Sequence, residues 1–299
     1  MDPNLRGKTV LITGAARGIG AESARRLAAR GANLSLVGLE PDELRRVADQ
    51  CGPNAAACDA DVTDWDALER AVEGTVERFG GIDVVVANAG IGSVGPARAI
   101  EPAAFERTIE VNLLGVWRTV RASLPHLIER RGYVLVVASL AAAIHAPGMA
   151  AYAASKAGAE AFADSLRVEL KHLGVDVGVG YFFFIDTDLV RGMDAHPVGG
   201  LRRRMGGVVA KTYPVATVAE AIADGIAERR RWILVPRWLG AVLVLRTALA
   251  PLLDRQSHKP AVEADALFQR EVAEHGADAA SRPLGPGGEA ARERAAGRA

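Results

Sequence analysis

The segment TGAARGIG, residues 13–20, directly follows a short apolar run, Lys8–Thr13, and leads into Ile19–Arg30, whose composition favours a helix. Glycines at such a turn let the backbone come close to a pyrophosphate. The free N–H groups and the partial positive charge of a helix N-terminus attract the same anion. A tight structural turn without a ligand is the alternative, but the strand before the turn and the helix after it favour a dinucleotide site.

Outward from this turn, strand-like and helix-like segments alternate along the chain. Short apolar runs predict further strands at Asn33–Val37, Ala55–Cys58, Asp83–Ala87, Tyr133–Ala138, Val175–Tyr181 and Trp232–Val235. Helices are predicted at Pro41–Gln50, Thr63–Phe79 with Thr63 as N-cap, Pro102–Arg130 (one or two helices), Ala151–His172 and Thr217–Arg230. Nearly continuous apolar strands are typical of a parallel sheet covered on both faces. The regular alternation therefore predicts a single α/β domain with a doubly wound, mostly parallel, Rossmann-type sheet.

Composition narrows the possible partners. The 299 residues carry a formal net charge of zero, whereas a nucleic-acid partner usually demands a basic face. Cys51 and Cys58 are the only cysteines, which favours free thiols in a reducing compartment, and no metal-ligand cluster is evident. The polar N-terminus has no secretory signal pattern, so we expect a cytoplasmic protein.

Three segments depart from the alternation that predicts an α/β domain over residues 1–236. The glycine-containing stretch 186–214 predicts a lid or binding loop, with a disordered insertion as the alternative. Residues 237–277 predict a helical extension whose apolar run, 238–253, is too short to span a bilayer. That run could pack against the domain, cover the pocket, lie between subunits or meet a membrane surface. The composition of residues 278–299 predicts a disordered tail.

The glycine spacing in residues 13–20 resembles that of the short-chain dehydrogenase/reductase family. Further motifs of the family follow in the same order, namely Asp61-Val62, Asn88-Ala89-Gly90, Asn112, Ser139 and Tyr152-Ala153-Ala154-Ser155-Lys156. The resemblance covers roughly residues 7–236. It implies an oxidoreductase that moves hydride between NAD or NADP and an alcohol or carbonyl, working as a homodimer or homotetramer.

The residues themselves indicate the proton chemistry. Tyr152 and Lys156 are four positions apart in a predicted helix, so their side chains share one face. A phenol has a pKa near 10, and a nearby ammonium lowers that pKa by stabilising the phenolate. We therefore expect Tyr152 to donate or remove a proton near neutral pH. An interfacial tyrosine beside a solvated lysine is the alternative.

The resemblance implies the remaining roles. Ser139 would hydrogen-bond the substrate oxygen, Lys156 would also bind the nicotinamide ribose, and Asn112 would hold the helix geometry and a proton-relaying water. The catalytic set is thus Asn112, Ser139, Tyr152 and Lys156. The expected cofactor-binding residues are Gly14, Arg17, Gly18, Ile19, Gly20, Glu40, Asp61, Val62, Asn88, Ala89, Gly90, Tyr152, Lys156 and Thr187.

The residues that follow the second predicted strand determine whether NAD or NADP binds. By alignment with the family, Gly38 occupies the usual place of the aspartate of NAD binders, and Leu39 that of the arginine of NADP binders. Arg17 could reach a 2′-phosphate, whereas Glu40 could accept hydrogen bonds from the ribose hydroxyls. The sequence slightly favours NADP.

Two phenylalanines mark a departure from the family pattern. Phe182 and Phe183 replace the Pro-Gly pair that precedes a threonine, here Thr187, in a variant similar to a subset of actinobacterial members. The rings predict an apolar wall for a bulky or lipid-like substrate, although alternate strand residues face the core instead. We expect four further residues in this wall: Ile144, His145, Met149 and Met193. A dinucleotide-binding regulatory protein without turnover and a peripheral membrane reductase acting on lipids remain alternative functions.

Overall fold

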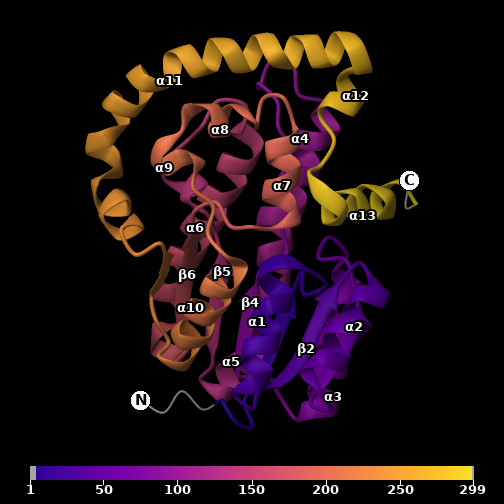
Figure 1. Cartoon of the computed structure of the whole chain (residues 1–299). Coiled ribbons are helices and arrows are strands. Elements are labelled where there is room, and N and C mark those ends of the chain that lie inside the picture. The colour runs from indigo at the N-terminus through magenta and orange to yellow at the C-terminus, as the bar shows by residue number, and fades with distance from the viewer. Residues whose placement is uncertain (1–4, 298–299) are drawn as a thin grey trace.

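The computed structural model describes residues 5–297 and contains one parallel seven-stranded sheet (Figure 1). Its strand order is β3-β2-β1-β4-β5-β6-β7. The strands are β1 (Thr9–Thr13), β2 (Asn33–Gly38), β3 (Ala55–Asp59), β4 (Val84–Ala87), β5 (Tyr133–Val137), β6 (Asp176–Phe182) and β7 (Trp232–Val235). The chain order reverses between β1 and β4, which is the crevice where doubly wound sheets bind ligands. The predicted Rossmann-type α/β fold is confirmed.

Helices cover both faces of the sheet. They are α1 (Gly18–Ala29), α2 (Pro41–Cys51), α3 (Trp65–Phe79), α4 (Pro102–Ile109), the π-helical turn η1 (Glu110–Leu114), α5 (Gly115–Arg130), the 3₁₀ turn η2 (Leu140–Ala142), α6 (Ala150–Leu170), the 3₁₀ turn η3 (Lys171–Leu173) and α10 (Val215–Ala227). Successive residues of β1 face opposite layers, as a strand requires. Leu11 packs in the core beneath α3, α5 and α6, whereas Val10 and Ile12 pack beneath α1 and α10.

The N-cap of α3 differs from the sequence prediction. Asp64, rather than Thr63, caps this helix, and its carboxylate accepts a hydrogen bond from the backbone N–H of Ala67 at 3.0 Å. Thr63 is engaged elsewhere, because its N–H donates to the carboxylate of Asp61 and its hydroxyl accepts from Arg107. The turn before α3 is therefore built to hold Asp61.

The stretch expected to be a lid or disordered insertion is mostly helical. It forms α7 (Asp188–Ala195), α8 (Leu201–Met205) and α9 (Gly207–Ala210). Arg202 is buried in its middle, where it pairs with Asp194 and stacks 4.2 Å from the ring centroid of Phe184. This buried, paired cation holds the segment against the body of the protein.

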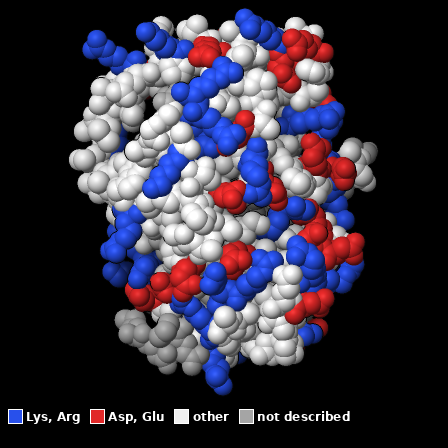
Figure 2. All heavy atoms as spheres, viewed as in Figure 1, with Lys and Arg blue, Asp and Glu red and all other residues white. Residues whose placement is uncertain are grey.

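The C-terminal extension is one long helix, α11 (Leu239–His275), which arches around the molecule in Figure 1. Its first turns bury Leu239 and Leu243 against the core and expose Val244, Leu245 and Leu252. No helix in residues 5–297 has both the length and the apolarity needed to cross a bilayer. Figure 2 shows basic and acidic side chains mixed over the viewed face, in keeping with the zero net charge.

The segment beyond α11 differs from the expected disordered tail. It forms the short α12 (Ala277–Ala280) and then α13 (Gly285–Ala296), which lies against the upper end of the sheet domain (Figure 1). Leu284 and Ala291 are buried there. Composition alone predicts disorder, but alanine has the highest helix propensity, and packing against the domain supplies the stabilisation that an isolated short helix lacks.

Substitution of Gly20 should disturb the turn on which the crevice is built. A methyl group placed on Gly20 would lie 2.2 Å from the carbonyl oxygen of Gly14, so we expect Gly20→Ala to lower the free energy of unfolding by about 1–3 kcal/mol. Gly74→Ala is the matched control, because a methyl on this α3 glycine meets nothing within 4 Å. Urea unfolding of both variants checks this, and equal stabilities would contradict it.

Candidate active site

A cavity of about 220 Å³ opens at the carboxyl ends of the central strands. Most of the residues expected from the sequence line it, namely Gly14, Arg17, Gly18, Ile19, Glu40, Asp61, Val62, Asn88, Ala89, Gly90, Ser139, Tyr152, Lys156 and Thr187. Gly20 and Asn112 do not line it. Both lie outside the cavity, Gly20 packed against the glycine-rich turn and Asn112 hydrogen-bonded to Ser155 of α6.

The glycine-rich turn is held to the end of β4 by Asn88. The side-chain amide of Asn88 donates to the carbonyl oxygens of Thr13 at 2.9 Å and Gly14 at 3.2 Å. In return, the hydroxyl of Thr13 accepts hydrogen bonds from the N–H groups of Asn88 and Ala89. Gly14 has a φ of +66°, and a methyl group on it would lie 2.8 Å from Cα of Ala89. Glycine is thus required for the close approach of β1 and β4.

Asn112 is fully buried in η1 and connects two parts of the site. Its Oδ1 accepts from the N–H of Ile91 at 2.8 Å, while its Nδ2 donates to the carbonyl of Ile91 at 2.8 Å and to Oγ of Ser155 at 3.0 Å. Ser155 in turn donates to the carbonyl oxygen of Tyr152. The amide therefore fixes α6, which carries Tyr152, against the loop that follows β4.

Tyr152, Ser139 and Lys156 meet at one end of the cavity. The hydroxyl of Tyr152 shares a hydrogen bond with the side chain of Ser139, which follows β5. Lys156 is 3 % exposed, and its Nζ lies 5.9 Å from the Tyr152 ring centroid. Within residues 5–297 this ammonium donates to a single carbonyl, that of Val137, at 2.8 Å. It therefore retains two N–H donors for a ligand.

The expectation that Lys156 lowers the pKa of Tyr152 is wrong for the protein alone. Burial raises the pKa of Tyr152 above its ordinary value, and the hydrogen bond with Ser139 offsets only part of that rise. Burial also lowers the pKa of Lys156 to about 8. The same desolvation acts on both groups, penalising the phenolate and the ammonium alike.

Asp61 lies at the other end of the cavity and is ionised. Burial works to raise its pKa, but hydrogen bonds from Thr63 and the Arg107 guanidinium outweigh burial and hold that pKa below its usual value. Nη2 of Arg107 lies 3.1 Å from Oδ2 of Asp61. The neighbouring Val62 also lines the cavity.

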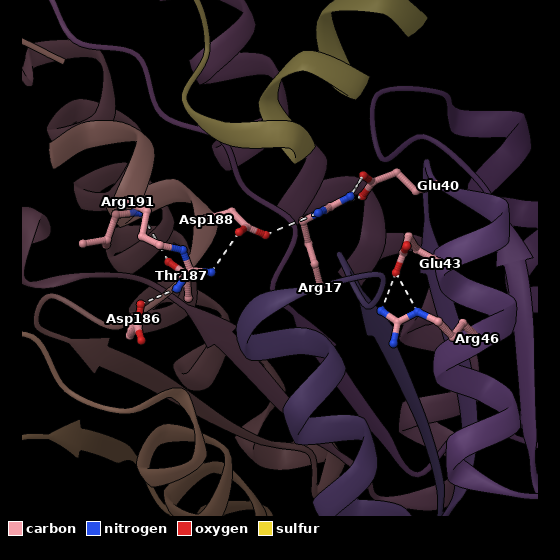
Figure 3. A network of polar contacts seen from close by, with 9 residues as sticks. Arg17, Glu40, Glu43, Arg46, Asp186, Thr187, Asp188 and Arg191 are labelled. Atoms are coloured by element: carbon pink, nitrogen blue, oxygen red, sulfur yellow. Dashed lines mark hydrogen bonds and ion pairs between the residues drawn. The ribbon is translucent and has the colours of Figure 1, made fainter. Parts of the chain in front are cut away.

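Arg17 connects three elements around the crevice (Figure 3). Its Nε donates to Oε2 of Glu40 at 3.0 Å, its Nη2 pairs with Oε1 of the same carboxylate, and its Nη1 donates to Oδ2 of Asp188 at 3.3 Å. The hydrogen bond that Arg17 donates to Glu40 is the main reason why the pKa of Arg17 is raised despite partial burial. Asp188 also pairs with Arg191. The sequence did not single out Asp188, although its place directly after Thr187 at the start of α7 was a usable signal.

The phenylalanines divide between the cavity and the core. Phe182 and Phe183 line the cavity, while Phe184 packs edge-on to Phe183 with ring centroids 4.9 Å apart. Ile144 and His145 lie instead on a separate cavity of about 520 Å³ between α6 and α11. Met149 and Met193 pack in a third apolar cluster, Met149 at its edge. None of these four residues lines the cavity beside Tyr152, so the predicted extension of the wall is wrong. Ile144, His145 and Met149 lie between β5 and α6, and Met193 of α7 is buried in the third cluster.

Four residues of the C-terminal segment also line the cavity, and sequence analysis missed all of them. They are Leu284, Gly287, Gly288 and Ala291. They lie more than 200 residues from the glycine-rich turn in the chain, and only the helix propensity of the alanines hinted at their structure.

The doubly wound sheet and the Ser139, Tyr152 and Lys156 constellation define an NAD(P)-dependent oxidoreductase acting on CH–OH groups. Comparison with known proteins agrees with this class. Residues 8–197 match the family model described as short chain dehydrogenase, and the chain belongs to the short-chain dehydrogenase/reductase family.

Three similar proteins illustrate the relationship. The 11-beta-hydroxysteroid dehydrogenase 1A of Arabidopsis thaliana is 32 % identical over 263 residues, which cover 84 % of this chain and 74 % of that protein. The 3-ketoacyl-(acyl-carrier-protein) reductase of Brucella melitensis, complexed with NADH, is 31 % identical with a TM-score of 0.66, covering 75 % of this chain and 92 % of that one. A short chain dehydrogenase/reductase from Burkholderia phymatum in complex with NAD is 25 % identical with a TM-score of 0.74, covering 83 % and 96 %.

The depressed pKa of Lys156 predicts a pH dependence of stability. Between pH 8 and the ordinary lysine pKa of 10.5, the unfolded chain holds a proton that the folded protein has lost, so stability rises with pH. Relative to Lys156→Met, the wild-type protein should gain up to about 3 kcal/mol across this range. Urea unfolding at pH 7 and pH 10 measures the gain. Lys171→Met, which removes an exposed lysine, serves as the control, and an equal gain in both comparisons would contradict the assignment.

Proposed function

We propose that this protein is an NAD-dependent dehydrogenase that interconverts a secondary alcohol and a ketone on a mostly apolar substrate. The observation that carries the proposal is the placement of Ser139, Tyr152 and Lys156 on the same cavity as the glycine-rich turn. The turn fits a dinucleotide, since Gly14 and Gly18 line the cavity where α1 begins, and Lys156 keeps two N–H donors free for ribose hydroxyls.

The chain's own groups would handle the proton and the orientation of the substrate. The Tyr152 and Ser139 hydroxyls hold the substrate oxygen by hydrogen bonds. Because burial raises the pKa of Tyr152, the phenol is protonated at neutral pH and can donate its proton to a ketone oxygen. In the oxidative direction the ionised phenol recovers that proton from the alcohol. A nicotinamide dinucleotide held by the glycine-rich turn and Lys156 would supply the hydride chemistry.

The walls near Tyr152 support an apolar substrate. Ile91, Phe183, Leu189 and Val190 line the same cavity as Tyr152. A substrate with a large apolar body buries these groups from water, which contributes about 25 cal/mol per Å² of apolar area. The name of the Arabidopsis relative, a hydroxysteroid dehydrogenase, is in keeping with such a substrate.

A regulatory dinucleotide-binding protein without turnover is the less favoured alternative. Desolvation of Lys156 destabilises the folded protein, and binding alone does not need a buried ammonium beside a phenol. We also propose that the enzyme works in the cytoplasm as a homo-oligomer, as family members commonly do. The exposed Leu114 and Trp117, one in η1 and the other in α5, offer an apolar surface for subunit contact.

The charges around Arg17 favour NAD over NADP, opposite to the slight preference drawn from the sequence. Glu40 accepts two hydrogen bonds from Arg17, and Asp188 accepts a third. Asp188 also pairs with Arg191, and Arg191 with Asp186, so the linked group of two guanidiniums and three carboxylates carries a net charge of −1. A 2′-phosphate would have to displace Glu40 and approach it as a like charge, whereas a ribose hydroxyl can donate to Glu40.

Tyr152→Phe should abolish most turnover while leaving cofactor binding intact. The substitution removes only the hydroxyl, so we expect kcat to fall by about 10²–10⁴ with little change in the Kd for NADH. A screen of apolar secondary alcohols and ketones with NAD and NADH, followed by nicotinamide absorbance, measures this. Tyr213→Phe is the control, and wild-type activity in Tyr152→Phe would refute the mechanism.

Glu40→Gln should shift the enzyme toward NADP. Removing this carboxylate releases Arg17 for a phosphate, so the ratio of kcat/KM for NAD to that for NADP should fall about tenfold, equivalent to about 1.4 kcal/mol. Glu43→Gln is a matched control, because Glu43 lies in the first turn of α2, which begins directly after Glu40, and pairs with Arg46 (Figure 3). An unchanged ratio in Glu40→Gln would count against the role of Glu40.

A further inference from the structure

The C-terminal helix α13 begins beside the catalytic tyrosine. The N–H of Leu284 donates to the carbonyl oxygen of Gly92 at 2.7 Å. A methyl group placed on Gly92 would lie 3.6 Å from Cδ2 of Tyr152 and 3.7 Å from Cδ1 of Leu284. Leu284 and Tyr152 therefore flank the same glycine, at the end of the cavity where the substrate oxygen would bind.

From there α13 continues to the opposite end of the cavity. A methyl group on Gly287 would lie 3.5 Å from Cδ of Arg17, so the helix passes over the glycine-rich turn. One turn later, the carbonyl of Ala291 accepts from Arg107 at 3.2 Å, and the same guanidinium binds Asp61. Nη2 of Arg294 then lies 3.1 Å from Oδ1 of Asp59, the last residue of β3.

We propose that α13 is a wall of the dinucleotide site, contacting the bound cofactor along its length, and that it must move for the cofactor to enter or leave. This inference rests on the function proposed above. It adds Leu284, Gly287, Gly288 and Ala291 to the cofactor-contacting residues. The match to the family model covers residues 8–197 and does not include these four residues.

A contact between glycines seats α13 on α7. A methyl group on Gly192 of α7 would lie 2.9 Å from the backbone nitrogen of Gly285, and one on Gly285 would lie 2.9 Å from the carbonyl oxygen of Asp188. Asp188, Leu189 and Val190 of α7 line the cavity as well. Because the two helices touch backbone to backbone, movement of α13 is coupled to the α7 wall of the substrate end.

Hydrogen exchange of the full-length protein tests the wall. We expect saturating NAD to slow amide exchange in residues 284–296 at least tenfold, and ADP-ribose, which lacks the nicotinamide, to slow exchange around Ala291. Calorimetry on the same samples establishes whether each ligand is bound. Bound NAD with unchanged exchange in α13 would overturn the inference and leave the proposed function standing. Failure to bind either NAD or NADP would overturn both.

A substitution outside the cavity tests the effect of α13 on cofactor release without changing any residue that lines the cavity. Gly192 does not line the cavity, and an alanine there pushes against the backbone of Gly285. We expect Gly192→Ala to release NADH at least threefold faster in stopped-flow fluorescence. Gly74→Ala, the helix glycine with open space around it, should release NADH at the wild-type rate.

A second pair of variants tests the same prediction independently, in case Gly192→Ala does not fold. Arg294→Ala removes the ion pair that joins α13 to β3, whereas Arg292→Ala removes a pair with Asp278 inside the C-terminal segment. The first should accelerate exchange in α13 and NADH release, and the second should accelerate neither. Wild-type rates of NADH release in both Gly192→Ala and Arg294→Ala would show that α13 does not control access to the cofactor.

Discussion

The geometry of the site depends on one buried amide, that of Asn112. It forms three hydrogen bonds, two with the backbone of Ile91 and one with Ser155. Leaving any of these groups unpaired inside the protein would cost about 1–3 kcal/mol, so the loop after β4 and helix α6 are held in one relative position. That position sets both the cavity wall at Ala89 and Gly90 and the place of Tyr152 and Lys156.

Two titratable groups at one end of this cavity have pKa values that differ from their values in water. Burial raises the pKa of Tyr152 and lowers that of Lys156 to about 8. Each shift is a free-energy cost of excluding water from a charged form. The strand ends and the hydrogen bonds of Asn112 hold the two side chains in place against this cost. The protonated phenol that results is the state that the proposed donation of a proton to a ketone requires.

Much of this arrangement could be predicted from the sequence, because its signals are local. Apolar runs and glycine spacing defined the strands and the turn, and the four-residue interval placed Tyr152 and Lys156 on one face. What could not be predicted depends on contacts between distant residues. Asp188 reaches Arg17 across 171 positions, and only the folded sheet brings them together. The order of the tail was missed for the same reason, since α13 is stabilised by a surface that composition does not describe.

Arg17 and Arg107 lie at the end of the cavity that contains Asp61, and both are paired with carboxylates. Arg17 is paired with Glu40 and Asp188, and Arg107 with Asp61, so both cations hold the walls together. With both guanidiniums engaged, the proposed attraction for a pyrophosphate would come from backbone N–H groups at the start of α1, whose dipoles carry only partial charge. The proposed preference for NAD, the dinucleotide with fewer negative charges, rests on this pairing. The arginines instead stabilise the walls of the cavity. Arg107 also donates to the carbonyl of Ala291 and thereby connects Asp61 to α13.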